Sequence, residues 1–309
     1  MFDLIVIGGG VSGLSAAMYG GRLGLKTLLI GEIMGGVMNF AHVVENYPGV
    51  ETTTGVELAE KFRNHASKYS VEFKEEKVES VDKISNGFTF KTSSAAYEGK
   101  TVVFATGSDV KKLGASGEKE FEGKGVHYCA LCDGPIYQDK VVAVVGGSDG
   151  AAKEALLLTE YASKVYIINR GDSMRAESHN IQKLLSNPKI TIIAKTCIAE
   201  IKGDKLVKSV LLDRAYNGKK ELKLDAVFVY VGRVPASQLA ASLGVKLSEK
   251  GEVITDKSSQ TNVAGVFAAG DVSNSSFKQI IVGAGDGVKA AYSAYMYLKN
   301  QGIQHVGDA

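Results

Sequence analysis

The chain has 309 residues, a length that predicts about two domains. Hydrophobic residues make up 45% of it and charged residues 23%, a globular balance that excludes a disordered or fibrous protein. The 36 basic and 34 acidic residues nearly cancel, so we expect no nucleic-acid partner, and three cysteines are too few for a secreted disulfide scaffold, which favours the cytoplasm.

The first thirty residues are typical of a strand, a turn, a helix and a second strand. Apolar runs at 3–7 and 26–30 flank a glycine-rich turn and helical spacing at 12–23, which predicts a βαβ unit. The stretch from Leu4 to Gly21 carries no charge, but six of its residues are glycine and no basic segment precedes it. We therefore predict neither a membrane span nor a signal peptide.

The same order of elements returns 138 residues later. Apolar runs at 141–145 and 164–168 flank a second glycine-rich turn and a helix predicted at 150–161. An internal duplication of a nucleotide-binding unit explains the match.

Other elements lie between and after the two copies. We predict a helix at 55–69, strands that end in the apolar run at 101–107, a hairpin of 207–213 and 220–224 around Asn217 and Gly218, strands at 226–232 and 265–271, and a helix at 277–299. No low-complexity linker separates these parts. The predicted fold is α/β with two Rossmann-like, three-layer ββα domains, the second inserted into the first: residues 1–111 and 236–309 form one, and 112–235 the other.

Gly8, Gly10 and Gly13 form the pattern GxGxxG directly after a strand and at the start of a helix. The first glycine permits a tight turn, the second lets backbone approach a pyrophosphate, and the third lets the helix pack closely on the strand. We predict a dinucleotide whose phosphates lie at the helix N-terminus. The alternative is a purely structural turn.

The residues after the second strand of each copy differ in charge. Glu32 suits a free ribose, as in FAD, whereas Arg170 and Arg175 suit a phosphorylated ribose, as in NADPH. The alternative is that all three are solvated surface charges. We assign to NADPH the second copy's positions Gly146, Ser148, Asp149, Ala151, Arg170 and Arg175.

Cys129 and Cys132, in the segment YCALCDG, can form a disulfide that is made and broken reversibly. Asp133 beside them can exchange a proton with a departing thiolate. The alternatives are half of a zinc site, which would need two further ligands, and an inert structural disulfide. We predict redox activity and no metal, and we expect the remaining Cys197 to be a buried apolar residue within a strand.

The segments VIGGGVSGLSA, VENYPG, VVFATG, CALCDG, VVGGSDGAAKEA, NRGDSMRAE and GVFAAGDV occur in the order found in low-molecular-weight thioredoxin reductases. The chain resembles that family over nearly its full length. CxxCDG between two nucleotide units is its most specific motif, because wider flavin disulfide reductases carry the redox cysteines in the first unit. The resemblance implies a homodimeric flavoenzyme that moves electrons from NADPH through FAD and the cysteine pair to thioredoxin.

The resemblance also implies roles for individual residues. Cys132 would face the flavin, Cys129 would attack the thioredoxin disulfide, and Asp133 would be the acid/base. The positions that match residues at the FAD are Gly35, Gly36, Asn46, Thr106, Gly107, Gly270, Asp271, Gln279 and Ile280.

Some positions depart from the family pattern. Ser148 stands where a glycine is usual, Asn169 and Gly171 replace a histidine and an arginine, and Gly31 replaces the usual ribose acid. One rival is therefore a reductase on the same scaffold with another donor or acceptor, such as a ferredoxin-dependent thioredoxin reductase or a dithiol oxidase. A second rival is a flavin-binding sensor without turnover, against which the intact CALCD segment argues.

Overall fold

The computed structural model describes residues 1–302, in which the chain divides into two compact units. Unit 1 contains Met1–Asp109 and the described residues from Val234 onward, and unit 2 contains Val110–Arg233. At the two crossings, strands β7 (Ser108–Val110) and β16 (Arg233–Pro235) pair with one another. The predicted α/β class with two parallel sheets is confirmed. Within residues 1–302, every helix is too short or too polar to cross a membrane.

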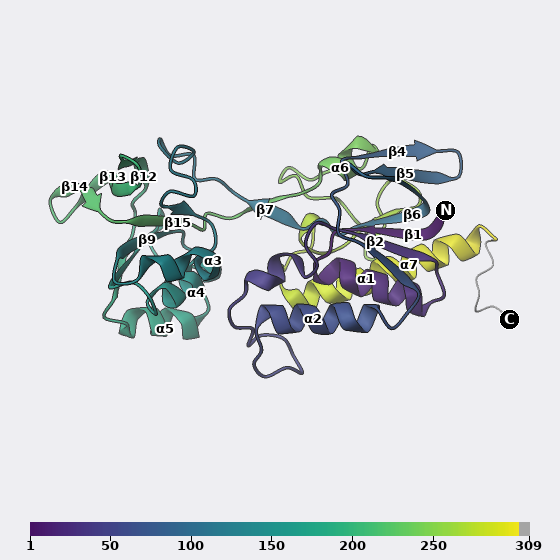
Figure 1. Cartoon of the computed structure of the whole chain (residues 1–309), viewed down its shortest axis with the longest axis horizontal. Helices are drawn as coiled ribbons and strands as arrows, with labels where there is room; N and C mark the ends of the chain where they lie inside the picture. Colours follow the sequence, from purple (N-terminus) through teal and green to yellow (C-terminus); the bar gives the residue numbers. More distant parts are fainter. Residues whose placement is uncertain (303–309) are drawn as a thin grey trace. The chain divides into compact units, whose positions relative to one another are not determined.

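Unit 1 is built on a seven-stranded sheet (Figure 1). Its strands are β1 (Phe2–Ile7), β2 (Thr27–Ile30), β3 (Val71–Lys74), β4 (Ser80–Ile84), β5 (Gly87–Lys91), β6 (Ala96–Phe104) and β17 (Val266–Ala268). Parallel pairing gives the order β3, β2, β1, β6, with β17 beside the end of β6. The start of β6 pairs antiparallel with β5, which pairs with β4.

Alternate residues of β1 face opposite sides of this sheet and join two separate cores. The helices of the unit are α1 (Val11–Arg22), α2 (Gly55–Ala66), α6 (Gln238–Ser242) and α7 (Ile280–Asn300), with 3-10 helices η1 (Gly36–Phe40) and η3 (Gly270–Val272). Ile5 and Ile7 lie in the core that includes Ala240 of α6. Leu4 and Val6 lie in the other, against α1 and α7. Because successive side chains of a strand point to opposite faces, the continuous apolar run of β1 supplies both cores.

Unit 2 repeats this three-layer plan. Its parallel strands are β8 (Val126–His127), β9 (Val141–Val145), β10 (Lys164–Ile168), β11 (Ile190–Ile193) and β15 (Ala226–Val229), its antiparallel strands are β12 (Ile198–Gly203), β13 (Val207–Tyr216) and β14 (Lys219–Lys223), and its helices are α3 (Ala130–Asp133), η2 (Gly134–Tyr137), α4 (Asp149–Leu158) and α5 (Ser178–Ser186). The parallel order is β11, β10, β9, β15, β8. One face packs on the antiparallel sheet and the other on the helices.

The sequence predicted most of these elements, but some helix ends differ in the structure. The hairpin turn has Asn217 and Gly218 at positive φ, as the Asn-Gly pair predicts. The helix predicted at 55–69 ends at Ala66, because Tyr69 belongs to the turn into β3, where Arg22 donates to its hydroxyl at 2.8 Å. The last helix begins at Ile280 rather than at 277, because Gln279 is extended (φ −138°).

A reciprocal hydrogen-bond pair caps α2. Thr54 Oγ1 accepts from the Glu57 amide at 3.2 Å, and Glu57 Oε2 accepts from the Thr54 amide at 3.1 Å. Such a capping box satisfies two amides that the first helical turn leaves without partners.

We predict that Thr54→Ala lowers the stability of unit 1 by about 1 kcal/mol, because the substitution leaves the Glu57 amide without its acceptor. Urea denaturation followed by circular dichroism measures the change. Thr52→Ala is the control, since Thr52 is exposed and precedes the helix. Equal midpoints for the two variants would contradict the prediction.

Candidate functional site

In the first glycine motif, Gly8 and Gly13 pack tightly against backbone atoms, whereas Gly10 borders open space. A methyl group on Gly13 would overlap the carbonyl oxygen of Gly8, so glycine is what lets α1 approach β1 so closely. By contrast, no described atom lies within 4 Å of where a side chain on Gly10 would begin. Gly10 is the N-cap of α1 and makes no side-chain hydrogen bond to the helix. The first amides of α1 therefore face a space that a phosphate fits.

A second glycine pair borders the same space. Gly35 and Gly36 have φ of +95° and +55°, a left-handed conformation that disfavours side chains. The Gly35 amide donates to the carbonyl of Gly9 at 2.8 Å, and a methyl on Gly36 would lie 2.9 Å from Cα of Gly10. The two glycine turns thus form one continuous backbone surface.

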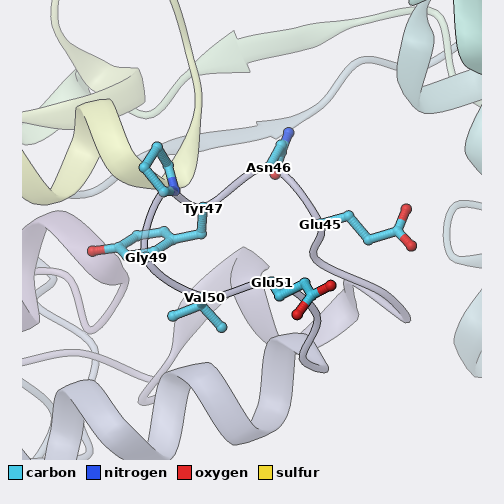
Figure 2. A pocket seen from close by; sticks show the side chains of 7 residues that line it. Glu45, Asn46, Tyr47, Gly49, Val50 and Glu51 are labelled. Carbon is cyan, nitrogen blue, oxygen red and sulfur yellow. The ribbon is translucent and has the colours of Figure 1, made fainter.

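Asn46 and Gln279, which are far apart in sequence, meet in unit 1. Asn46 Nδ2 donates to Gln279 Oε1 at 3.1 Å. Asn46 lies in the loop of residues 45–51, which curls around a hollow of about 470 Å³ (Figure 2). Gln279 is the N-cap of α7, and Ile280 is its first residue. The segments VENYPG and KQI therefore lie at one place.

Two other predicted segments lie at the ends of the strands β6 and β17. Thr106 Oγ1 donates to the carbonyl of Ala236 at 2.6 Å, and Gly107 O accepts from the Ala236 amide at 3.0 Å. Gly270 (φ +74°) starts η3 and leaves no room for a methyl beside Ser12 of α1. The backbone oxygen of Asp271 accepts from Lys278 at 2.8 Å.

Glu32 lies two residues after β2 and is exposed. Its carboxylate lies 3.8 Å from Lys77 Nζ, also exposed, so this ion pair is weak and easily exchanged for another partner. Gly31, which stands before it, packs against the amide of Gly9 and has no space for a side chain. The close packing of the first glycine turn thus accounts for the missing acid at position 31.

The second glycine motif differs at its helix N-terminus. Ser148 is the N-cap of α4, and its Oγ accepts from the Ala151 amide at 3.4 Å, so one of the helix's free amides already has a partner. Asp149 Oδ1 accepts from the Glu177 amide at 2.9 Å and from Asn180 at 2.8 Å. Its carboxylate therefore ties α4 to α5. Gly146, at the end of β9, packs against the Tyr230 carbonyl.

Arg170 and Arg175 occupy one loop after β10, and both side chains are exposed. Buried Asn169 shapes this loop: its Oδ1 accepts from the Gly171 amide at 3.0 Å and its Nδ2 donates to the Ser173 carbonyl at 2.9 Å. The Arg175 amide donates to the Gly147 carbonyl at 2.6 Å. Within residues 1–302, neither guanidinium has a carboxylate within ion-pair distance. Both charges are therefore available to an anion.

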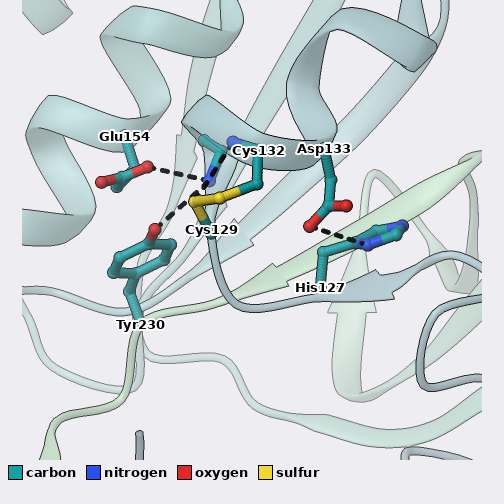
Figure 3. The surroundings of a disulfide bond; sticks show 7 residues. His127, Cys129, Cys132, Asp133, Glu154 and Tyr230 are labelled. Atoms are coloured by element: carbon teal, nitrogen blue, oxygen red, sulfur yellow. Dashed lines mark hydrogen bonds and ion pairs between the residues drawn. A yellow bond between two sulfur atoms is a disulfide. The ribbon is translucent and has the colours of Figure 1, made fainter. Parts of the chain in front are cut away.

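Cys129 and Cys132 form a disulfide at the start of α3 (Figure 3). Cys129 is the N-cap of this short helix and is half-buried, whereas Cys132 is exposed. Cys129 Sγ accepts from the Cys132 amide at 3.1 Å. The pairing predicted for these two cysteines is confirmed.

Two distant residues hold the backbone between the cysteines. The Ala130 amide donates to Glu154 Oε2 of α4 at 3.1 Å and lies 3.3 Å from the Tyr230 hydroxyl, just after β15 (Figure 3). Burial, followed by the Glu154 charge, raises the pKa of Tyr230, so its hydroxyl stays protonated. Sequence reasoning missed both residues, since neither lies near the CxxC motif in the chain.

Sequence reasoning also missed His127, the second residue before Cys129. His127 Nδ1 lies 3.2 Å from Asp133 Oδ2, and its Nε2 lies 2.7 Å from the Tyr137 hydroxyl. Burial lowers the pKa of His127 below 6.5, while the charge and hydrogen bond of Asp133 oppose that shift. A histidine beside a CxxCD motif was the signal that could have found it.

The expectation for Cys197 was wrong. Its side chain is exposed, and it lies just before β12, where Ile198 takes the buried position. Successive residues of an extended segment face opposite sides, so the buried neighbour leaves Cys197 outside.

Comparison with known proteins shows which family the chain matches. The family model described as pyridine nucleotide-disulphide oxidoreductase matches residues 2–303. The chain is 38% identical over 300 residues to the thioredoxin reductase of Treponema pallidum, covering 96% of this chain and 97% of that protein. The crystal structure of Lactococcus lactis thioredoxin reductase matches with a TM-score of 0.93 at 36% identity, covering 97% of this chain and 100% of that one.

A further solved structure, the thioredoxin reductase of T. acidophilum, matches with a TM-score of 0.90 at 37% identity, covering 96% of this chain and 98% of that one. A ferredoxin-flavin thioredoxin reductase from Clostridium acetobutylicum matches with a TM-score of 0.53 at 31% identity, covering 97% and 99%.

We predict that Gly13→Ala yields protein without bound dinucleotide, because the added methyl forces α1 away from the Gly8 carbonyl and displaces the amides at its N-terminus. The ratio of flavin to protein absorbance after purification measures the loss. Gly285→Ala is the matched control, since its methyl would point into open space on α7. Full flavin content in Gly13→Ala would show that the close contact is dispensable.

Proposed function

The chain belongs to the thioredoxin reductases of the pyridine nucleotide-disulphide oxidoreductase family, and we propose that it carries electrons from NADPH through FAD and the Cys129–Cys132 disulfide to a thioredoxin-like protein. The family implies the use of a flavin and of a pyridine nucleotide. The observation that carries the proposal is the accessible disulfide in a unit that repeats the nucleotide-binding βαβ order of unit 1.

In this proposal unit 1 holds FAD. The open space at Gly10 and the uncapped amides of α1 fit a pyrophosphate, and Glu32 can exchange Lys77 for a ribose hydroxyl. The joined pair of Asn46 and Gln279 offers amide groups to the flavin. Bound FAD would supply the two-electron chemistry that links a nicotinamide to a disulfide.

Unit 2 would hold NADPH. Exposed Arg170 and Arg175 offer two cations to a ribose phosphate, and arginine suits phosphate because its donors bind two oxygens together. Gly146 and the N-terminus of α4 lie at the end of β9, the edge of a parallel sheet where nucleotides bind.

The cysteine pair would act by thiol exchange. Two electrons and two protons convert the disulfide to a dithiol. The Cys129 thiolate then attacks the partner's disulfide and releases one partner thiolate, and Cys132 attacks the Cys129 sulfur of the mixed disulfide, releasing the second. Asp133 would take up the thiol proton and return it to a leaving thiolate.

We also propose that the chain forms a homodimer, as the resemblance implies. Tyr292 and Met296, both on α7, are 52% and 37% exposed and supply apolar surface for such a contact. The exposed free thiol of Cys197 supports a cytoplasmic, reducing compartment.

One observation favours a second candidate, a reductase with a different electron donor. Ser148 takes up an α4 amide that a pyrophosphate would otherwise use, which weakens the second nucleotide site. In that case a protein such as ferredoxin would replace NADPH as the electron donor.

We predict that Cys129→Ser lowers NADPH-dependent reduction of thioredoxin to the background rate, because the attacking thiolate is absent. Reduction of ferricyanide, which can take electrons from the flavin directly, should persist. Cys197→Ser is the control, since Cys197 is the one other cysteine of the chain and is exposed. Undiminished thioredoxin reduction by Cys129→Ser would refute the proposed route.

We predict that Arg170→Ala combined with Arg175→Ala raises the KM for NADPH by about 10- to 100-fold, because charge-assisted hydrogen bonds to the ribose phosphate are lost. The KM for NADH should change little. Arg214→Ala, also exposed in unit 2, is the control. A parallel rise in both KM values would assign the arginines a different role.

A further inference from the structure

A row of three hydrogen-bonding groups, centred on buried His127, lies next to the CxxC segment. It runs from the Tyr137 hydroxyl to His127 Nε2 at 2.7 Å, and from His127 Nδ1 to Asp133 Oδ2 at 3.2 Å. Figure 3 shows the His127–Asp133 contact. The His127 side chain is only 6% exposed, whereas that of Asp133 is 36% exposed. The ring of Phe228 on β15 stacks on the imidazole, with 5.3 Å between the two ring centroids, and so restricts the orientation of the imidazole. The row therefore has the buried imidazole at its centre and the partly exposed carboxylate that follows Cys132 at one end.

The hydrogen bonds select one tautomer of His127. Burial raises the pKa of Tyr137 to about 12, so its hydroxyl stays protonated and can donate to Nε2. A neutral imidazole that accepts at Nε2 carries its proton on Nδ1, and this proton points at Asp133. Because burial also lowers the pKa of His127, the ring is neutral at neutral pH.

We propose that His127 is a positioning residue for Asp133: its neutral ring fixes the rotamer of this carboxylate, which follows Cys132 in the chain, and its protonation makes that carboxylate a poorer proton acceptor. The inference rests on the proposed function, in which Asp133 takes up the Cys129 proton.

The fixing effect follows from the position of Asp133. This residue ends the one-turn helix α3, and its partly exposed side chain has several rotamers open to it. The Nδ1–H group selects the one that faces His127. A general base acts efficiently only when it is held within reach of its proton, so losing this bond should slow thiol transfer.

The groups around the ring determine how a positive charge on His127 acts on Asp133. The titratable groups around the ring are Asp133 from α3 and Tyr137 from η2, with Asp225, just before β15, acting on Tyr137. Below the lowered pKa of His127, a positive charge stands 3.2 Å from Asp133 Oδ2 and stabilises the ionised carboxylate. Proton uptake by Asp133 then becomes less favourable. As the pH falls, the rate of thiol exchange therefore decreases more steeply than protonation of the thiolates alone would make it decrease.

Two substitutions separate the fixing effect from the charge effect. In His127→Asn the side-chain amide can replace the Nδ1 donor but cannot titrate. In His127→Gln the amide reaches toward Tyr137 instead and leaves Asp133 without its donor. Tyr166→Phe is the matched control, because Tyr166 lies on β10 and packs its ring against Tyr216.

The test is the single-turnover reaction of the dithiol with dithiodipyridine in a Cys197→Ser background, after reduction by dithiothreitol and desalting. Rates are measured from about pH 5 to 9. We expect His127→Gln to react about 10-fold more slowly than the unaltered chain near neutral pH. His127→Asn should match the unaltered chain at high pH and exceed it increasingly as the pH falls below the pKa of His127.

Either half of the proposal can fail by itself. An unchanged rate in His127→Gln would overturn the positioning role, and a constant ratio of His127→Asn to the unaltered chain across the pH range would overturn the charge effect. Because the dithiol is made chemically, neither result depends on the electron donor. Failure of the proposed function shows separately, as inability of the unaltered chain to reduce a thioredoxin disulfide with NADPH.

Discussion

The close contact between α1 and β1 is the constraint on which unit 1 depends. It exists because Gly13 has no side chain to hold the helix away from the Gly8 carbonyl. Once α1 lies there, its N-terminus stands at the end of the parallel sheet. The turn at Gly35 docks on the same backbone through a 2.8 Å hydrogen bond, and α7 packs on α1 where Gly287 meets the Ser12 carbonyl. Open space remains at Gly10, where no described atom lies within 4 Å of the position that a side chain would take.

Unit 2 has the same βαβ framework as unit 1 but different residues at its glycine turn and helix N-terminus. Ala151 stands where unit 1 has Gly13, and Ser148 caps the helix where unit 1 has an uncapped Gly10. Ser148 Oγ accepts from the Ala151 amide, so one fewer free amide remains at this helix N-terminus. The exposed charges of Arg170 and Arg175 offer compensation from the neighbouring loop. Unit 2 also carries the disulfide, and Glu154 and Tyr230 hold the Ala130 amide between its cysteines.

The strongest sequence predictions rested on local rules. The two βαβ copies, the Asn217 turn and the cysteine pair each follow from spacing that a short segment reveals by itself. Cys197 was misplaced because its neighbour Ile198 takes the buried position at the start of β12, and adjacent residues of an extended segment face opposite sides. His127, Glu154 and Tyr230 escaped prediction for a different reason: they converge on the cysteines through tertiary packing, which leaves no periodic signal in the chain.

The central claim is that NADPH delivers electrons to this chain through a flavin. Anaerobic titration of the purified yellow protein with NADPH and, separately, with NADH tests it most directly, through the flavin's visible absorption band. The account predicts fast bleaching by NADPH and slow or incomplete bleaching by NADH. A flavin that stays oxidised with both nucleotides would contradict the account and would mean that another protein donates the electrons.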